Sequence, residues 1–293
     1  MSKTVKVIVL TTAICAVMFG TVLGCGLERE EYVKETGTEK PLKINGKHYR
    51  QKKEKLNYTG KMIQVDLKQI DFSVCTSDDE SFYLEYDICS KKDKNPLSVS
   101  VKDETLVLKE QDGKTAEYYE GVYVDGIGNL IKGTKERYRG VAVLYVPVAM
   151  NEGSLSLNMG NGDAEIQGTV WKELNVKMEN GDLQLADGSI CNGSLLTTEG
   201  DIDTENVGVS GRMEVQTGEG DIDWKLNPSD YDNLPIYART EMDIDVLGVF
   251  DGNLIQNESN SFYKRIVENE QRILKLISEE GDIVIESLSL IHI

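Results

Sequence analysis

The chain has few of the side chains from which enzyme sites are usually built. Its 293 residues include only two histidines, His48 and His292, so a histidine triad or a histidine metal site has almost no material. It contains neither a Gly-x-Ser-x-Gly nucleophile elbow nor a phosphate-binding loop. The sequence therefore offers no catalytic residue and no cofactor site, and it predicts a protein that is not an enzyme.

Two features leave an enzyme open as the alternative. A glycine-rich run begins at Gly126 and Gly128, but its spacing departs from the dinucleotide-binding fingerprint, and an exposed hairpin loop explains it. Acidic residues are abundant, so a glycan-active envelope enzyme with paired carboxylates would need no other residue type. A deep groove that holds two acids with raised pKa values would favour this alternative.

Positive charge is also scarce. The chain has 32 Lys and Arg residues against 50 Asp and Glu, which gives a formal net charge of −18. Nucleic acid and anionic lipid would be repelled, which argues against either as the main partner. Basic partners and divalent cations are compatible with this charge.

Long apolar runs are missing after the first 25 residues. Lys3 and Lys6 precede an apolar segment, residues 7–22, and the sequence Val22-Leu23-Gly24-Cys25 follows. This order is typical of a secretory signal peptide, residues 1–24, and its end resembles a bacterial lipobox, whose cysteine carries a lipid. We therefore expect an extracytoplasmic lipoprotein that Cys25 attaches to the cell membrane. An uncleaved anchor helix and a plain signal peptide are the alternatives.

The segment after this cysteine, residues 25–60, is polar, charged and poor in large apolar side chains, which predicts a flexible tether. Its basic stretch from Lys47 to Lys55 could meet lipid headgroups, but the interspersed acids favour a solvated linker. Three cysteines remain besides Cys25 in the mature chain: Cys75, Cys89 and Cys191. They are too few for a disulfide framework in an exported protein, so we expect free thiols that fill the core.

What the chain has instead is a repeat. Gly-Asp occurs at residues 162–163, 181–182, 200–201, 220–221 and 281–282, and Met242-Asp243 continues the series without the glycine. The first four aspartates are 19, 19 and 20 residues apart. A fixed period of this size is typical of a stacked repeat fold.

Apolar residues alternate with polar ones on both sides of each aspartate. Leu174, Val176 and Met178 stand eight, six and four residues before Asp182, and Leu183 follows it directly. Alternation with period two indicates strands with one buried and one solvated face, and the glycine suits a turn with positive φ. A helix is excluded, because no segment keeps apolar residues at a spacing of three to four.

Two short strands cannot bury their own apolar face, so neighbouring units must stack. We predict an all-β solenoid or β-roll over residues 61–293, with an irregular first part (61–150) and regular repeats (151–293). One expected repeat is missing between Gly248 and Arg272. A β-sandwich of hairpins is the alternative fold.

The strands around Gly-Asp-Ile, preceded by Leu144-Tyr145-Val146-Pro147, resemble a bacterial putative-adhesin family of unknown function. The segments 70–74, 82–86, 97–101 and 105–108 also fit, so the resemblance covers the chain from about residue 62 to its end. It implies a right-handed β-solenoid or β-roll in an envelope or membrane-attached protein.

One group of side chains suggests a metal ligand. Three Asp-Ile-Asp segments should point their carboxylates outward and their isoleucines inward, because residues two apart in a strand share a face. In successive coils they would form a ladder of six carboxylates, whose repulsion calcium would relieve. The spacing matches neither a calcium-binding roll nor an EF-hand, so we favour solvated aspartates that cap turns. The six residues are Asp201, Asp203, Asp221, Asp223, Asp243 and Asp245.

Together these features predict a membrane-anchored envelope lipoprotein with a non-enzymatic binding, adhesion or scaffold role. Its expected partners are the membrane, through the lipid on Cys25, and an envelope protein or surface ligand. No nucleic acid is expected.

Overall fold

The computed structural model describes most of the chain after residue 46: residues 47–90, 94–111, 118–120, 136–138, 140–148, 150, 152–230, 233–248, 252–257, 260–267 and 271–287. The predicted signal peptide, Cys25, the glycine-rich run at Gly126 and His292 lie outside the described residues. Apart from one short 3-10 turn, η1 (Pro228–Asp230), the regular elements of this part are all strands. None of its residues forms a helix with the length and apolar character needed to cross a membrane.

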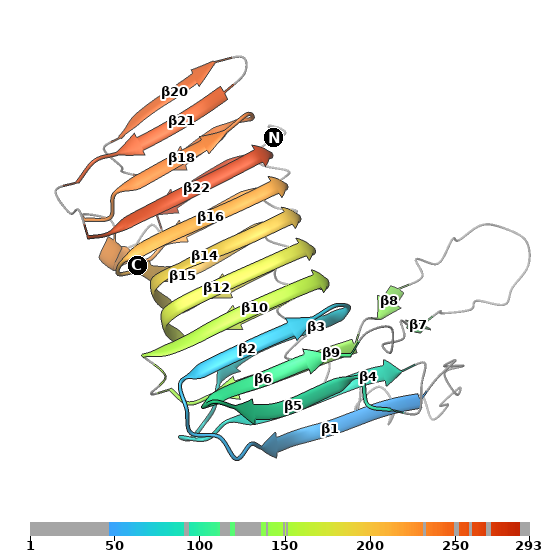
Figure 1. The fold of residues 1–293 in the computed structure, drawn as a ribbon. Helices are drawn as coiled ribbons and strands as arrows, with labels where there is room; N and C mark the ends of the chain where they lie inside the picture. The colour runs from blue at the N-terminus through green and yellow to red at the C-terminus, as the bar shows by residue number, and fades with distance from the viewer. Residues whose placement is uncertain are drawn as a thin grey trace, which may run out of the picture. The chain divides into compact units, whose positions relative to one another are not determined.

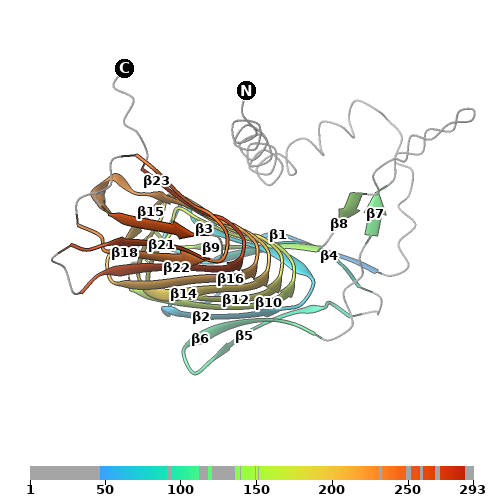
Figure 2. The ribbon, with the colours of Figure 1, turned by 90° about the horizontal axis from the view of Figure 1, so that it is seen from above.

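The strands form two layers, which we call sheet A and sheet B (Figures 1 and 2). In spatial order, sheet B contains β5 (Leu97–Lys102), β6 (Thr105–Glu110), β2 (Met62–Leu67), β10 (Gly153–Asn161), β12 (Val170–Asn180), β14 (Ser189–Glu199), β16 (Arg212–Glu219), β22 (Ile273–Glu280), β18 (Ile236–Thr240), β21 (Asn260–Arg265) and β20 (Asn253–Asn257).

Sheet A contains, in the same direction, β1 (Lys47–Lys55), β4 (Tyr83–Ser90), β9 (Gly140–Val146), β3 (Ile70–Thr76), β11 (Ala164–Gln167), β13 (Leu183–Ala186), β15 (Ile202–Val209), β17 (Ile222–Leu226), β23 (Ile283–Ser287) and β19 (Ile244–Leu247). A separate antiparallel pair joins β7 (Tyr118–Glu120) and β8 (Glu136–Tyr138).

Each repeat contributes one strand to each sheet, and successive repeats pair in parallel. Leu157 lies beside Val176, and Val176 beside Leu195, so the apolar positions keep their register from coil to coil. These residues are buried between the sheets, as are Ile202 and Ile222 on the opposite layer. Parallel stacking excludes the sandwich of hairpins, and the prediction of an all-β solenoid is confirmed.

The order of the coils departs from the order of the sequence at both ends. At the C-terminal end, the last coil, β22–β23, lies between the coils β16–β17 and β18–β19. The hairpin β20–β21, which fills the interval where a repeat was missing, pairs with β18 on the outside. At the other end, β2–β3 pairs directly with β10–β11, although the two coils are about 90 residues apart.

A buried ion pair holds the inserted coil. Arg272, next to the start of β22, contacts the carboxylate of Asp230 in η1 and donates a hydrogen bond through Nε to the carbonyl of Val209 at 2.9 Å. The second carboxylate oxygen of Asp230 accepts a hydrogen bond from the N–H of Val209 at 2.8 Å. The three residues therefore tie β15, η1 and β22 together, which fixes the last coil against the middle of the stack.

The prediction of a tether up to residue 60 is wrong for its last part. Lys47–Lys55 forms β1, which pairs with β4 at the edge of sheet A. The charged sequence of this segment does not show the alternation that predicts a strand. Backbone pairing can hold such a strand at the edge of a sheet, where charged side chains are common. Cys75, Cys89 and Cys191 form no disulfide with one another or with any other described residue, but only Cys89 is buried, so the expected core packing holds for one of the three.

Candidate functional site

The Gly-Asp turns, the strongest signal in the sequence, lie where each coil passes from sheet B to sheet A. Gly200 has φ of 138°, and a Cβ built on it would come within 2.1 Å of the carbonyl oxygen of Gly181 in the coil below. The same close approach recurs between Gly220 and Gly200. Met242 takes the place of this glycine in coil β18–β19, the outermost in sheet A, and Ile70 takes it in coil β2–β3.

The aspartates of these turns form a continuous hydrogen-bonded ladder. The carboxylate Oδ1 of each accepts a hydrogen bond from the backbone N–H of the aspartate in the next coil, over distances from 2.7 to 3.1 Å. The motif thus satisfies backbone donors at the corner, where the strand ladder is interrupted. From donor to acceptor the pairs are Asp163 to Asp71, Asp182 to Asp163, Asp201 to Asp182, Asp221 to Asp201, Asp282 to Asp221, and Asp243 to Asp282.

The predicted ladder of six carboxylates in three successive coils is wrong. Asp203 lies beside Asp223, as expected. Asp223, however, pairs with Val284, and Val284 separates it from Asp245. The repeat spacing could not reveal this, because the period orders coils along the chain and β22–β23 is inserted out of sequence.

A broader acidic surface covers the outer face of sheet A. We call it the acidic row: neighbouring strands place five carboxylates in one line across the sheet, interrupted by Val143, Ser73, Gln184 and Val284. The carboxylates of the acidic row belong to Glu85, Glu165, Asp203, Asp223 and Asp245. Glu85 and Glu165 were not predicted to belong to this surface, because only the strand register aligns them with the repeat aspartates.

The environment of the acidic row raises the pKa values of three of its carboxylates, those of Asp203, Asp223 and Glu165. Burial, followed by the negative charges of Asp223 and Asp201, raises the pKa of Asp203 to about 7. Burial also raises the pKa values of Asp223 and Glu165, although the ammonium of Lys225, 3.9 Å from Asp223, acts against this in Asp223. One carboxylate oxygen of Asp223 is buried and accepts no hydrogen bond within the described part. Carboxylates held this close in partly desolvated surroundings favour a cationic neighbour.

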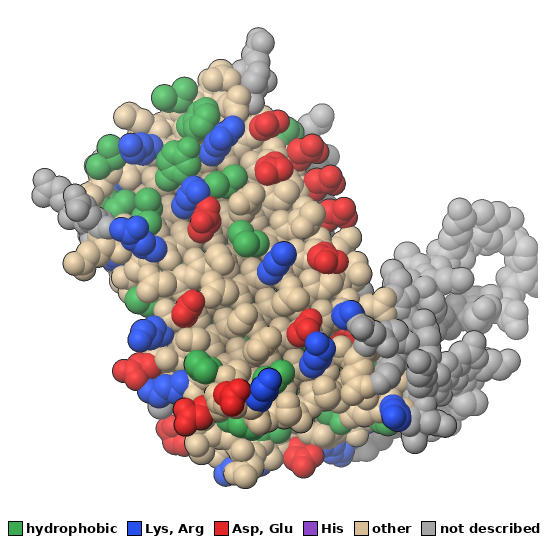
Figure 3. Space-filling model, in the orientation of Figure 1, with side chains coloured by type: hydrophobic (Ala, Val, Ile, Leu, Met, Phe, Trp, Pro, Cys, Tyr) green, Lys and Arg blue, Asp and Glu red, His purple; other side chains and the backbone are tan. Residues whose placement is uncertain are grey.

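The outer face of sheet B has a different character. Figure 3 shows it as largely uncharged: Lys and Arg side chains are scattered over the face, and many of the acidic side chains gather along one edge. Glu199, Glu219 and Glu280 pair in register at the ends of β14, β16 and β22, close to the Gly-Asp turns. The two broad faces of the stack therefore present distinct chemistry to a partner.

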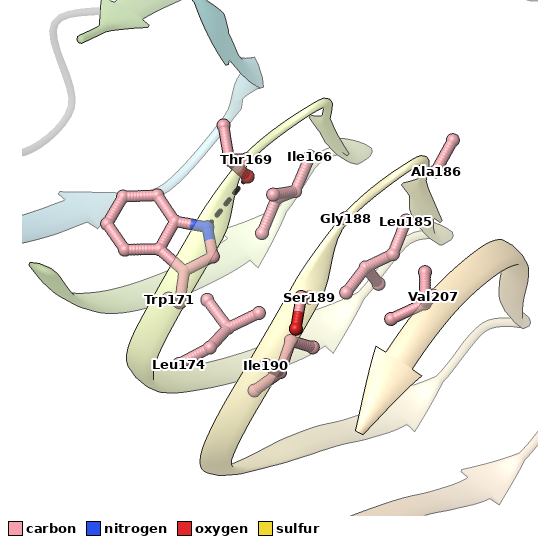
Figure 4. Close-up of a pocket in the computed structure, with 10 residues that line it drawn as sticks. All are labelled: Ile166, Thr169, Trp171, Leu174, Leu185, Ala186, Gly188, Ser189, Ile190 and Val207. Carbon is pink, nitrogen blue, oxygen red and sulfur yellow. Dashed lines mark hydrogen bonds between the residues drawn. The ribbon is translucent and has the colours of Figure 1, made fainter. Parts of the chain in front are cut away.

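The interior of the stack is filled. Figure 4 shows a cavity between β11, β12, β13 and β14 whose volume is only about 10 Å³. Its wall is apolar apart from groups such as the hydroxyl of Thr169, which accepts a hydrogen bond from Nε1 of Trp171 at 2.8 Å. Such a space holds no more than a water molecule, so it is no ligand site.

A larger, open hollow of about 270 Å³ lies near the N-terminal end of sheet A, lined by Lys53, Asp78, Asp79 and Tyr83. The ammonium of Lys53 lies 5.0 Å from the ring centre of Tyr83 and 4.2 Å from that of Tyr145. Lys53 also pairs with Asp78 at 3.5 Å. The lysine therefore already occupies the aromatic faces that a sugar or a cationic ligand would need.

Catalytic and metal-binding groups do not converge in the described part of the chain. It contains no cluster of three or more His, Cys, Asp or Glu placed to hold a metal ion. Burial raises the pKa of the Cys75 thiol to about 11, which keeps it protonated at neutral pH and unsuited as a nucleophile. Neither Asp203 nor Asp223 lines the cavity beside Trp171 or the hollow beside Lys53.

These features define a class of repeat-built, all-β protein with a filled core and two broad outer faces. Residues 60–236 match the family model described as Toastrack DUF4097, and the chain belongs to this family. The resemblance to putative adhesins is confirmed at this level. No curated protein matches the sequence.

Solved structures of similar proteins come from several bacteria. A putative cell adhesion protein from Clostridium sporogenes is 15% identical, with a TM-score of 0.43, over 83% of this chain and 99% of that one. A putative adhesin from Bacteroides fragilis is 16% identical, with a TM-score of 0.43, over 83% and 97%. A putative lipid binding protein from Parabacteroides distasonis is 15% identical, with a TM-score of 0.30, over 83% and 98%. These likenesses are remote, and family membership rests on the sequence match.

Proposed function

We propose that the protein is a non-enzymatic binding module of the cell envelope, held at the outer surface of the membrane by lipid on Cys25. The acidic row on sheet A is its contact surface, and its partner carries positive charge. The observation that carries this proposal is the five carboxylates aligned across a rigid sheet, two of them adjacent and with raised pKa values.

Rigidity and charge together support binding. Coils joined by parallel strands and by the aspartate ladder hold the side chains of the acidic row in fixed positions, so little conformational entropy is lost when a partner docks. Pairing with a cation would relieve the repulsion between Asp203 and Asp223, which the single ammonium of Lys225 only partly offsets.

The glycan-active enzyme is supported less well. Asp203 and Asp223 do have raised pKa values, as a general acid requires. They lie on the outer face of sheet A, however, and line neither the cavity beside Trp171 nor the hollow beside Lys53, whereas hydrolysis of a glycosidic bond requires a site that encloses the sugar and excludes bulk water.

The contact surface can be tested by mild crosslinking on intact cells with two charge-matched variants. The face variant carries Asp203→Asn, Asp223→Asn and Asp245→Asn. The ladder variant carries Asp182→Asn, Asp201→Asn and Asp221→Asn, which removes the same charge but keeps an oxygen acceptor in each turn. We expect the captured partner to disappear only with the face variant. Equal capture by both variants would exclude the acidic row as the contact surface.

The anchor can be tested separately, by fractionation and by sequencing the mature N-terminus. Replacing Cys25 with alanine should release the protein from membranes or leave it uncleaved, because the cysteine thiol is the site that carries the lipid. Stable attachment needs more than one acyl chain, so loss of the whole modification should be visible. A mature N-terminus at any other residue would contradict lipidation of Cys25.

A further inference from the structure

The end of sheet B carries an edge strand without the usual protection against pairing. All five residues of β20, Asn253–Asn257, are exposed, with Ile255 61% and Leu254 43% accessible. Within the described part, β20 pairs on one side only, with β21. An edge strand offers unpaired backbone N–H and C=O groups, which natural proteins normally shield with charge, proline or a covering element. β20 has no charged residue and no proline.

The edges of sheet A differ in this respect. β1, at one end, contains five Lys and Arg residues and a glutamate, and β19, at the other, contains Asp245. Charged side chains of this kind oppose the approach of a second strand. β5, at the other end of sheet B, ends in Lys102, so β20 is the edge strand of the two sheets that carries no charged residue (Figure 1).

Charge indicates which partner fits this edge. The chain carries a net charge of −18, so two copies repel each other over most of their surface. The end formed by β18, β21 and β20 is an exception: the outward side chains of β21 include Lys264 and Phe262, and Arg239 of β18 lies 5.7 Å from the ring centre of Phe262. Figure 3 shows hydrophobic, Lys and Arg side chains gathered there. Two copies can meet at this end without bringing carboxylate faces together.

The strand is also complementary to itself. In an antiparallel pair, residues directly opposite share a face, so a two-fold register must place outward residues opposite outward ones. With Ile255 opposite its own counterpart, all five residues are used: Asn253 faces Asn257, and Leu254 faces Gln256. The outward row Phe262–Ile255 then continues across the axis into the same row of the second copy.

We propose that the protein forms a two-fold dimer through antiparallel pairing of β20 with β20 of a second copy, which joins the two B sheets into one. The contact is isologous and closed, so it stops at two copies. The acidic rows of both copies stay outside it, and the dimer therefore presents two of the proposed contact surfaces on one rigid body.

Position-specific disulfide crosslinking of the full chain, in membranes or in mild detergent, tests this arrangement. Ile255→Cys places two thiols opposite each other at a distance that a disulfide spans, so oxidation should give a covalent dimer that the parent does not form. Asn253→Cys should give none, since two such thiols lie roughly 14 Å apart along the strands. The double variant Asn253→Cys, Asn257→Cys should again crosslink, and it keeps Ile255 in place if that substitution impairs folding.

Val101→Cys on β5 is the matched control, because β5 is the exposed edge at the other end of sheet B and Val101 is 54% accessible. No Val101→Cys dimer is expected, and no mixed product with Ile255→Cys. A mixed product would show head-to-tail pairing of β5 with β20 and overturn the proposal. So would the absence of dimer in both Ile255→Cys and the double variant, which would leave the edge to an extended segment of another protein.

Discussion

The backbone N–H of Asp282 donates a hydrogen bond to the carboxylate of Asp221 over 2.7 Å, although 61 residues separate the two in sequence. The contact shows that the Gly-Asp motif acts between coils and not within one. Glycine allows the corner backbones to approach, and aspartate satisfies the N–H of the next corner. The hydrogen bond between Asp282 and Asp221 also shows that coil β22–β23 is the direct neighbour of coil β16–β17.

The ladder predicts that the acceptor oxygen of Asp221 matters more than its charge. Asp221→Ala leaves the N–H of Asp282 without its partner and should lower the free energy of unfolding by about 1 kcal/mol. Asp221→Asn keeps an oxygen at the same place and should change stability by less than half as much. Urea denaturation of the two variants measures the difference. Equal losses would show that the charge, and not the hydrogen bond, holds the corner.

The close approach of the corners predicts that their glycines cannot be replaced. Gly200→Ala would bring a Cβ within 2.1 Å of the carbonyl oxygen of Gly181 at a positive φ, and should cost roughly 2 kcal/mol or more. Gly208→Ala is the control, because its nearest neighbour, Oγ of Ser189, would lie at 3.6 Å. Thermal unfolding should separate the two variants clearly. Similar melting temperatures would mean that the corners lie farther apart than described.

The raised pKa of Asp203 predicts a pH dependence of stability. The folded-state value of about 7 exceeds the ordinary 3.8, so the folded state holds the proton more tightly than the unfolded chain does. The contribution of this carboxyl is therefore fully present below about pH 4 and is lost as the pH rises to about 7. Asp203→Asn should be more stable than the parent at pH 8, and the two should converge near pH 4. Asp245→Asn, at an exposed site, is the control. A stability difference between Asp203→Asn and the parent that stays the same at all pH values would contradict the burial of Asp203.

Calcium should have no specific effect on stability. Val284 lies between Asp223 and Asp245, so the six aspartates do not form one set of calcium ligands. The face variant removes the adjacent pair Asp203 and Asp223 and the separate carboxylate of Asp245. We expect calcium and matched magnesium to shift the melting temperature equally in the parent and in the face variant, Asp203→Asn, Asp223→Asn, Asp245→Asn. A calcium-specific gain that this variant abolishes would establish the calcium site.

Local pattern predicted the strands but not their order in space. Alternation around each aspartate placed Ile202 and Ile222 inside, where they are fully buried, because one face of each strand must be apolar. The same reasoning failed for Lys47–Lys55, whose strand is held by backbone pairing with β4 and shows no apolar pattern. The acidic row was only partly predictable, since the alignment of Glu165 with Asp203 depends on the register between neighbouring strands of sheet A.

The inserted coil was invisible for a different reason. A repeat period gives the number and length of coils, while the position of β22–β23 depends on contacts such as Arg272 with Asp230, which lie 42 residues apart. Both main inferences rest on that position: it interrupts the acidic row at Val284, and it moves β20 to the free end of sheet B.

The position of the last coil can be measured directly with engineered cysteine pairs. Glu219 of β16 lies opposite Glu280 of β22, so Glu219→Cys with Glu280→Cys should form an intramolecular disulfide on mild oxidation, detected by mass spectrometry of the linked peptides. Glu219→Cys with Glu241→Cys is the matched pair, equivalent in the repeat, that would be adjacent if the coils stacked in sequence order. The account predicts a disulfide in the first pair and none in the second. The reverse result would contradict the inserted coil.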